Sequence, residues 1–227
     1  MSPSSPTKAK RPSSATNTTP PNPRKGELST LLPPTTLLEP DVLIRMLLAY
    51  SGAVWSDKFP VEWAKEKAST PYGQLPVLVE HEDGTGKEVF RIAQSHAIAR
   101  YLAAKFGLNP SNPHEHALQD SVFESVSDLE IAAGKFIWEK DEKQKDIFRD
   151  QFFDDKLPVF LSYHEKLWKR MGPMGTTLER RLLSRTCDAR LEHHLIKAPG
   201  LKKLIAHYRA DAKLAKYLEG SRCPVRF

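Results

Sequence analysis

Two stretches of the 227-residue chain carry clear helical patterns of apolar positions. Residues 42–51 (VLIRMLLAYS) are apolar except for one arginine, which predicts a buried helix. In residues 95–106 (SHAIARYLAAKF) the apolar positions follow the i, i+3, i+4 spacing of an amphipathic helix. Gly52 and Gly107 follow the two stretches, and a glycine just past the last periodic residue commonly ends a helix. We place Ser95 at the N-cap of the second helix.

The segment between these helices alternates between strand-like and turn-like composition. Residues 53–59 (AVWSDKF) predict a short strand, and residues 60–69 (PVEWAKEKAS) predict a short helix with a proline at its start. Two further strands, residues 77–80 and 89–93, flank the stretch HEDGTGKE. Its glycines and acidic residues are typical of a hairpin loop.

Beyond residue 107 the pattern becomes wholly helical. The stretch LNPSNPHE reads as a linker with two prolines. The long segments that follow all predict helices: 114–138, 144–170, 177–195 and 199–219. The sequence therefore predicts an α/β unit of residues 28–108 followed by an all-α unit of residues 113–221.

Residues 1–27 differ in composition from the rest of the chain. They are rich in Pro, Ser and Thr and hold almost no large apolar side chains. Such a segment cannot bury enough surface to offset its ordering entropy, so we expect a disordered tail, with a basic docking signal as the alternative. Residues 1–26 contain no acidic residue and account for five of the six net positive charges: Lys8, Lys10, Arg11, Arg24 and Lys25. The remainder is nearly neutral, which argues against a nucleic-acid-binding face.

The cysteines and the hydropathy bear on the cellular compartment of the protein and on its partners. Cys187 and Cys223 form no CxxC pair and indicate neither a disulfide framework nor a metal site. No apolar run is long enough to span a bilayer, and no N-terminal apolar segment of the signal-peptide kind occurs. We therefore expect a cytoplasmic protein with no metal and no membrane or nucleic-acid partner.

Two short motifs carry the candidate chemistry. In GQLPVL, Pro76 stands at the entrance of a strand, and the residue before a proline is held extended. The N–H and C=O of Leu75 can then pair with another extended backbone. In AQSHAIARYL, Gln94 and Ser95 stand at a helix N-terminus, where unpaired N–H groups favour a carboxylate or phosphate. A ligand with a peptide backbone and a free carboxylate suits both motifs, whereas a plain N-cap is the simpler explanation of Ser95.

The combination STPYGQLPVLVE, then AQSHAIARYLAAKFGL, resembles the glutathione transferases. Within them it is most similar to the sigma-like branch, which includes the prostaglandin D synthases and the S-crystallins. The resemblance covers residues 42–170 closely and 198–219 more loosely. It implies a thioredoxin-like N-terminal domain, an all-α C-terminal domain (the glutathione transferase fold) and a cis peptide bond before Pro76.

The resemblance also implies a glutathione site. Trp63 and Lys67 resemble the family's contacts to the glycine carboxylate of glutathione, and one helical turn separates them. Leu75 resembles the backbone partner of the cysteinyl unit, presented by Pro76, and Gln74 lies next to it. Without the resemblance, Trp63 is an ordinary core residue and Lys67 a solvated charge.

The remaining site residues lie at and beyond the second motif. Gln94 and Ser95 resemble the clamp on the γ-glutamyl carboxylate. Asp128, in ESVSDLE, resembles the acid that reaches the γ-glutamyl amine from the other subunit, and an exposed helix position is its plainer explanation. A homodimer is therefore implied.

Two segments depart from the family pattern. Taking Arg45 as the family's arginine places Pro34 where a tyrosine normally stabilises the glutathione thiolate, and Pro40 where an arginine assists it. Thr35 and Thr36 are weak hydroxyl substitutes, because an aliphatic hydroxyl is far less acidic than a phenol. The prolines also make STLLPPTTLLEPD a poor first strand. Residues 176–197 are unusually charged for a core helix.

The leading hypothesis is thus a glutathione transferase that conjugates glutathione, its co-substrate, to small apolar electrophiles, with no other cofactor. The missing tyrosine keeps open a non-enzymatic, crystallin-like protein that binds glutathione or another ligand. The two defective segments keep open a chain without a stable fold. A thiol–disulfide oxidoreductase is disfavoured, because residues 28–108 contain no cysteine.

Overall fold

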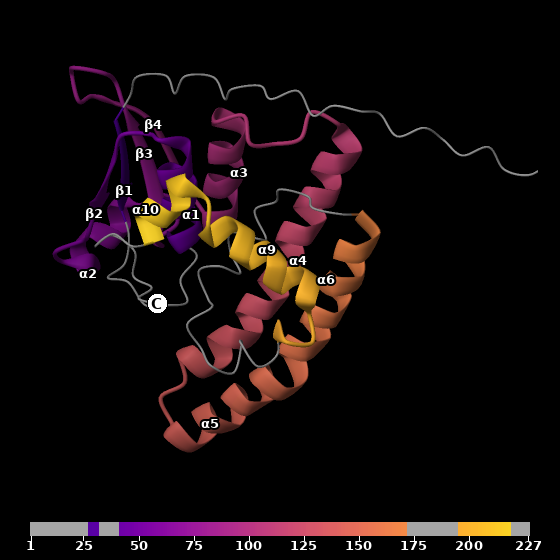
Figure 1. The fold of residues 1–227 in the computed structure, drawn as a ribbon. Helices are drawn as coiled ribbons and strands as arrows, with labels where there is room; N and C mark the ends of the chain where they lie inside the picture. Colours follow the sequence, from indigo (N-terminus) through magenta and orange to yellow (C-terminus); the bar gives the residue numbers. More distant parts are fainter. Residues whose placement is uncertain (1–26, 32–40, 172–194, 219–227) are drawn as a thin grey trace, which may run out of the picture.

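The computed structural model describes residues 27–31, 41–171 and 195–218 (Figure 1). Its first part contains four strands, three helices and a 3₁₀ turn. In chain order these are β1 (Leu28–Leu31), α1 (Asp41–Ser51), β2 (Trp55–Lys58), α2 (Trp63–Glu66), the 3₁₀ turn η1 (Lys67–Ser69), β3 (Val77–His81), β4 (Glu88–Ala93) and α3 (Ser95–Lys105). The strands form one mixed sheet in the order β2-β1-β3-β4, in which β1 is parallel to β2 and antiparallel to β3.

The two faces of the sheet bury different side chains. Leu78 of β3 joins the main core together with α1 and α3, which lie beside the sheet in Figure 1. Its neighbours Val77 and Val79 point to the opposite face and pack with Ala93. This alternation is the period of two expected of a strand covered on both sides. The prediction of a thioredoxin-like unit is consistent with this sheet.

Strand β1 corrects one expectation from the sequence. We expected a poor first strand around Pro33 and Pro34, yet residues 28–31 form a strand in the middle of the sheet. The strand ends before the two prolines, so no missing N–H interrupts the described ladder. Residues 32–40, including Pro34, Thr35, Thr36 and Pro40, lie outside the described residues.

A buried charged group ties α1 to the sheet. Arg45 is 1% exposed, and its Nε donates to Asp57 Oδ2 over 3.0 Å. The other carboxylate oxygen, Oδ1, accepts a hydrogen bond from Thr30 Oγ1 over 2.7 Å. A buried guanidinium is tolerated only when it is paired, so this group joins α1, β1 and β2 at one point.

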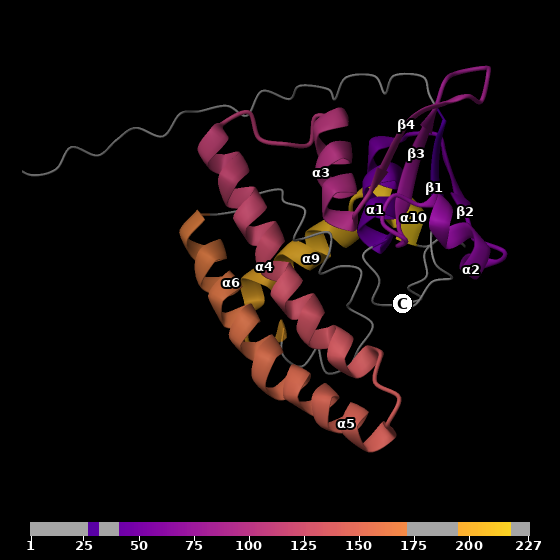
Figure 2. The same cartoon turned by 180° about the vertical axis from the view of Figure 1, so that it is seen from behind.

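The second part of the chain is helical. Its elements are α4 (Pro113–Ile137), α5 (Glu142–Asp150), the π-helical turn η2 (Gln151–Lys156), α6 (Leu157–Met171), α9 (Pro199–Arg209) and α10 (Ala212–Leu218). Figures 1 and 2 show α4 and α6 side by side, with α9 leading to α10 back toward α1. The main apolar core runs without a break from α1 and α3 into α4, α6 and α9. None of the helices described is long and apolar enough to cross a membrane.

Two of the predicted helices are interrupted. The predicted helix 144–170 contains the wide turn η2, which places the consecutive side chains Phe152 and Phe153 in the core beside Phe136. The predicted helix 199–219 breaks before Asp211, whose carboxylate caps α10 by accepting from Lys213 N over 2.9 Å. The predicted helix 177–195 and the charged residues 176–197 lie almost wholly outside the described residues. The domain limits 28–108 and 113–221 stay predictions.

The short elements follow the glycine and turn signals. Gly107 has φ +65° after α3, and Gly107 N and Leu108 N donate to Ala104 O and Ala103 O. This is a Schellman ending, and it confirms the predicted stop signal. The hairpin loop between β3 and β4 is confirmed as well. The predicted helix 60–69 begins only at Trp63 and becomes the turn η1 at Lys67.

Asp57→Ala should lower the free energy of unfolding by about 3 kcal/mol, because it takes the carboxylate from a buried guanidinium. Denaturant titration of the purified protein measures this. Glu142→Ala is the control, since it removes a carboxylate from an exposed pair with Lys145 and should cost less than about 1 kcal/mol. Equal losses in the two variants would contradict the structural role of Asp57.

Stability should also fall in acid through His164. This imidazole lies in the helical core, 2.9 Å from Ser125 Oγ, and burial lowers its pKa from 6.5. The unfolded chain therefore binds the proton more readily, and the contribution of His164, complete above pH 6.5, is lost as the pH falls toward the lowered folded value. His164→Gln should show a shallower loss of stability between pH 8 and pH 5. An identical pH dependence in both proteins would exclude His164 as the cause.

Candidate functional site

The pairing of β3 with β4 brings the two sequence motifs together. Val77 pairs with Ala93 in an antiparallel register. One residue before Val77 is Pro76, and one residue after Ala93 is Gln94, so the two motifs meet at the same end of the sheet. The Leu75–Pro76 peptide bond is cis, as the resemblance implies. Within the described residues, neither the N–H nor the C=O of Leu75 has a backbone hydrogen-bond partner.

The two glutamines of the motifs are in contact. Gln94 Nε2 donates to Gln74 Oε1 over 3.2 Å, although 20 residues separate them. Gln94 also has φ +73°, which is unusual for a residue other than glycine. Residues held in such sparsely populated regions cluster at functional sites, where they cost about 1–3 kcal/mol each. The chain thus accepts a strained residue at the junction of β4 and α3.

The start of α3 corrects the predicted cap. Gln94, not Ser95, occupies the N-cap, and its side chain makes no capping hydrogen bond. Ser95 is the first helical residue, and Ile98 N closes the first turn by donating to Gln94 O over 2.9 Å. The N–H groups of residues 95–97 therefore lie at the open end of the helix, beside the Leu75 loop. This end carries a partial positive charge and suits a carboxylate.

Lys67 lies against the loop at Gly73. Gly73 has φ +63°, and a Cβ at this position would lie 3.1 Å from Lys67 Cε. The lysine stem is therefore packed over the glycine, two residues before Leu75. Trp63 is half-buried and precedes Lys67 by one turn, and no residue of α2 is buried. The interpretation of Trp63 as an ordinary core residue is wrong. Composition gave no signal for the contact between Lys67 and Gly73.

Asp128 lies apart from this group. It is an exposed residue of α4, and within the described residues no contact joins it to Gln74, Leu75 or Ser95. Its neighbour Ser127 approaches His96, the residue after Ser95, with 3.5 Å between Oγ and Nδ1. The structure thus brings six of the eight predicted binding residues together around the Leu75 loop and α3. Trp63 lies one turn before Lys67 on α2, and Asp128 lies on the helical part.

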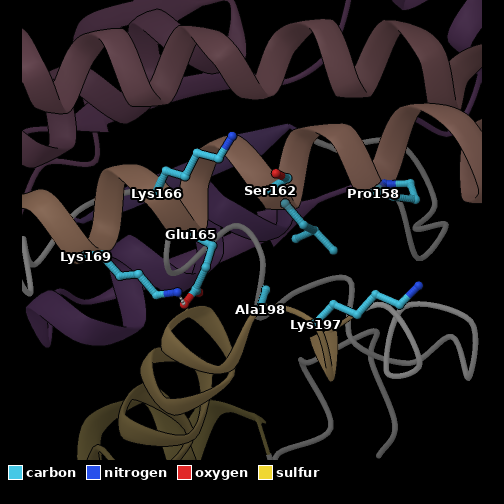
Figure 3. Close-up of a pocket in the computed structure, with 8 residues that line it drawn as sticks. Pro158, Ser162, Glu165, Lys166, Lys169, Lys197 and Ala198 are labelled. Carbon is cyan, nitrogen blue, oxygen red and sulfur yellow. Dashed lines mark ion pairs between the residues drawn. The ribbon is translucent and has the colours of Figure 1, made fainter.

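A separate cavity of about 360 Å³ lies between α6 and the start of α9 (Figure 3). Its lining includes Leu161, Glu165 and Lys197, and none of the predicted site residues. Glu165 Oε2 accepts hydrogen bonds from Gly200 N and Leu201 N, and so caps α9. In Figures 1 and 2, α6 lies on the side of α4 away from the sheet, so this cavity is not the predicted site. In the described part of the chain, no cluster of three or more His, Cys, Asp or Glu residues could hold a metal ion.

The chain matches known proteins over most of its length. It is 30% identical over 179 residues to Probable glutathione S-transferase 6 of Caenorhabditis elegans, which covers 73% of this chain and 82% of the relative. The chain belongs to the glutathione transferase family. The chain spans about half the length of Glutathione S-transferase 2 of Manduca sexta, at 34% identity and 55% of that protein. No family model matches.

Solved structures give the same fold. NaGST-2 superimposes with a TM-score of 0.68 at 27% identity, over 89% of this chain and 98% of that chain. Prostaglandin synthase D of Nilaparvata lugens, at 24% identity, has a TM-score of 0.69 over 87% of this chain and supports the fold alone. The predicted glutathione transferase fold, a thioredoxin-like unit followed by helices, is therefore confirmed. Hematopoietic prostaglandin D synthase of Gallus gallus is 35% identical over 117 residues, or 51% of this chain and 52% of that protein.

Proposed function

We propose that this protein is a glutathione transferase that binds glutathione where the Leu75 loop meets the start of α3. The observation that supports this most is the antiparallel register Val77–Ala93. It brings the Leu75 main chain, which has no backbone hydrogen-bond partner within the described residues, beside the N-terminus of α3. The first feature suits the peptide backbone of a tripeptide, and the second suits its terminal carboxylate. A ligand with only one of these groups would leave half of the site unused.

Each predicted residue takes a role in this arrangement. Leu75 offers its main chain to the cysteinyl unit, and Pro76 fixes the orientation of that main chain. Ser95 and the N–H groups of the first turn of α3 receive the γ-glutamyl carboxylate, with Gln94 beside them. Gln74 supports Gln94 through their hydrogen bond. Trp63 and Lys67 are assigned to the glycine carboxylate, and the stem of Lys67 lies against Gly73 of the loop.

The chemical step requires the thiolate of glutathione. The thiol loses its proton to solvent, its sulfur forms a bond to an electrophilic carbon, and a halide leaves when the electrophile is an aryl halide. Because a free thiol has a pKa of about 8.5, a nearby hydroxyl donor would help to stabilise the thiolate. Thr35 and Thr36 are the candidates in this chain, since Pro34 occupies the tyrosine position.

Glutathione binding without catalysis is the second candidate function. Prolines at positions 34 and 40, where the family pattern has a tyrosine and an arginine, favour it. The residues assigned to glutathione binding lie in other segments of the sequence. A crystallin-like or carrier protein of this kind would retain glutathione and turn over no electrophile.

We further propose a sigma-like member that acts in the cytoplasm as a homodimer, with no cofactor besides glutathione as co-substrate. The carboxylate of Asp128 is exposed and is therefore available to a second subunit. There it would meet the γ-glutamyl amine of the glutathione bound to that subunit. Dimerisation is not universal among the structural relatives, because Na-GST-3 of Necator americanus is described as monomeric. The mass of the protein in solution, measured by light scattering, distinguishes the two states.

Retention on immobilised glutathione, followed by an assay with a generic aryl halide, tests the proposal. Retention with turnover supports a transferase, and retention without turnover supports the binding protein.

Ser95→Ala should weaken glutathione binding by about 1–3 kcal/mol, because it removes a donor to a charged carboxylate. The control is Ser121→Ala, whose hydroxyl donates to Leu118 O within α4. Equal affinities for both variants would contradict the role of Ser95.

Gly73→Ala should raise the dissociation constant of glutathione about tenfold, because its Cβ displaces the stem of Lys67, and one charge-assisted contact is worth about 1.5–3 kcal/mol. Calorimetric titration with glutathione measures the change. The matched control is Gly84→Ala, which has a similar φ of +75° but no atom within 4 Å of the added Cβ. Backbone strain alone would weaken both variants equally, and that result would exclude the contact with Lys67.

A further inference from the structure

His96 lies on the first turn of α3, directly after Ser95, and faces α4. Its side chain is 23% exposed. Nδ1 is 3.6 Å from Glu124 Oε2 and 3.5 Å from Ser127 Oγ, and Nε2 is 3.7 Å from Glu130 Oε2. Each ring nitrogen therefore faces a carboxylate of the same helix. None of the sequence motifs accounts for this arrangement.

The imidazole ring is also packed against an aromatic side chain. The centroids of His96 and Phe123 are 4.5 Å apart, and Phe123 is fully buried in the core that runs into α4. Packing on one face and two carboxylates at the edges leave the ring few alternative rotamers. The first turn of α3 is therefore fixed against α4 at one point.

A second contact between the same helices lies one turn further along α3. Arg100 pairs with Glu124 and with Asp120, the latter over 3.1 Å, and its guanidinium lies 5.1 Å from the ring centroid of Phe123. Arg100 thus shares Glu124 with His96 but is separated from Ser95 by a turn of helix. Both His96 and Arg100 contact acidic side chains of α4. Only His96 lies at the N-terminal end of α3, where the candidate site is.

The γ-glutamyl clamp consists of groups whose directions are set by this first turn. The position of the first turn sets the directions of the N–H groups of residues 95–97 and of the Ser95 hydroxyl. A small displacement of this turn would weaken their hydrogen bonds to a charged group. We propose that His96 is a positioning residue for glutathione, which holds the first turn of α3 against Glu124 and Glu130 of α4. This inference rests on the proposed function of the site. It links glutathione affinity to the contact between the two parts of the chain.

His96→Leu tests the proposal, because leucine keeps the packing on Phe123 and loses both polar contacts. We expect the dissociation constant of glutathione to rise about tenfold. If the protein turns over an electrophile, its kcat at saturating glutathione should change less than twofold. His96→Asn should restore affinity to within about threefold of the unchanged protein, because its amide nitrogen can occupy the place of Nδ1. Arg100→Leu is the matched control, and should lower the melting temperature without raising the dissociation constant.

Hydrogen exchange supplies a readout that needs no ligand. Ile98 N–H closes the first turn, so its exchange should be about tenfold faster in His96→Leu and unchanged in Arg100→Leu. Unchanged exchange at Ile98, or equal loss of affinity in both leucine variants, overturns the positioning role. If the unchanged protein fails to bind glutathione, the proposed function fails, and the exchange measurement still decides whether His96 holds the turn.

Discussion

The register between β3 and β4 is the constraint on which the candidate site depends. Side chains alternate along a strand, so a slip of one residue would turn Val77 and Val79 from one face of the sheet to the other. The same slip would move Pro76 away from Gln94. Burial of the valines therefore also fixes the distance between the Leu75 loop and the start of α3. The irregularity of this ladder lies at Glu80 and His81, toward the hairpin loop, and leaves the site end regular.

The site also requires that α3, which begins there, is held in place against the sheet. The C-terminal half of α3 is tied to β3, because Tyr101 Oη and Lys105 Nζ each lie 2.6 Å from Glu80 Oε1. Burial and the hydrogen bond to Glu80 raise the pKa of Tyr101, so this hydroxyl remains a donor at physiological pH. With Arg45 and Asp57 fixing α1 beneath the sheet, the polar groups of the core serve mainly to set the positions of helices. Such groups contribute less to stability than to the definition of one arrangement.

The sequence predicted the elements whose signals are local. Gly107 and the hairpin glycines require positive φ, and the proline of GQLPVL can stand only at a strand end, so each marks a boundary directly. The approach of the two motifs came from the family resemblance, and the ladder confirmed it. Features set by tertiary packing were missed. The wide turn η2 exists because Phe152 and Phe153 both fill the core, and periodicity cannot reveal this. Likewise, Ser95 is a good cap by type, but the strand pairing extends to Ala93 and moves the cap to Gln94.

In the proposed function, glutathione binding and catalysis are assigned to different segments of the chain. The groups assigned to glutathione are largely main-chain atoms and a helix end, positioned by β3, β4 and α3. Within the described residues, their arrangement depends on the buried side chains of Val77 and Val79 and on the hydrogen bonds that tie α3 to β3. In the proposed function, thiolate stabilisation is instead assigned to a hydroxyl of residues 32–40, where Pro34 and Pro40 stand at the positions of the family's tyrosine and arginine. The prolines follow β1, which ends at Leu31, so they remove no N–H from the described ladder of that strand. In the proposed function, binding and turnover therefore depend on different segments of the chain.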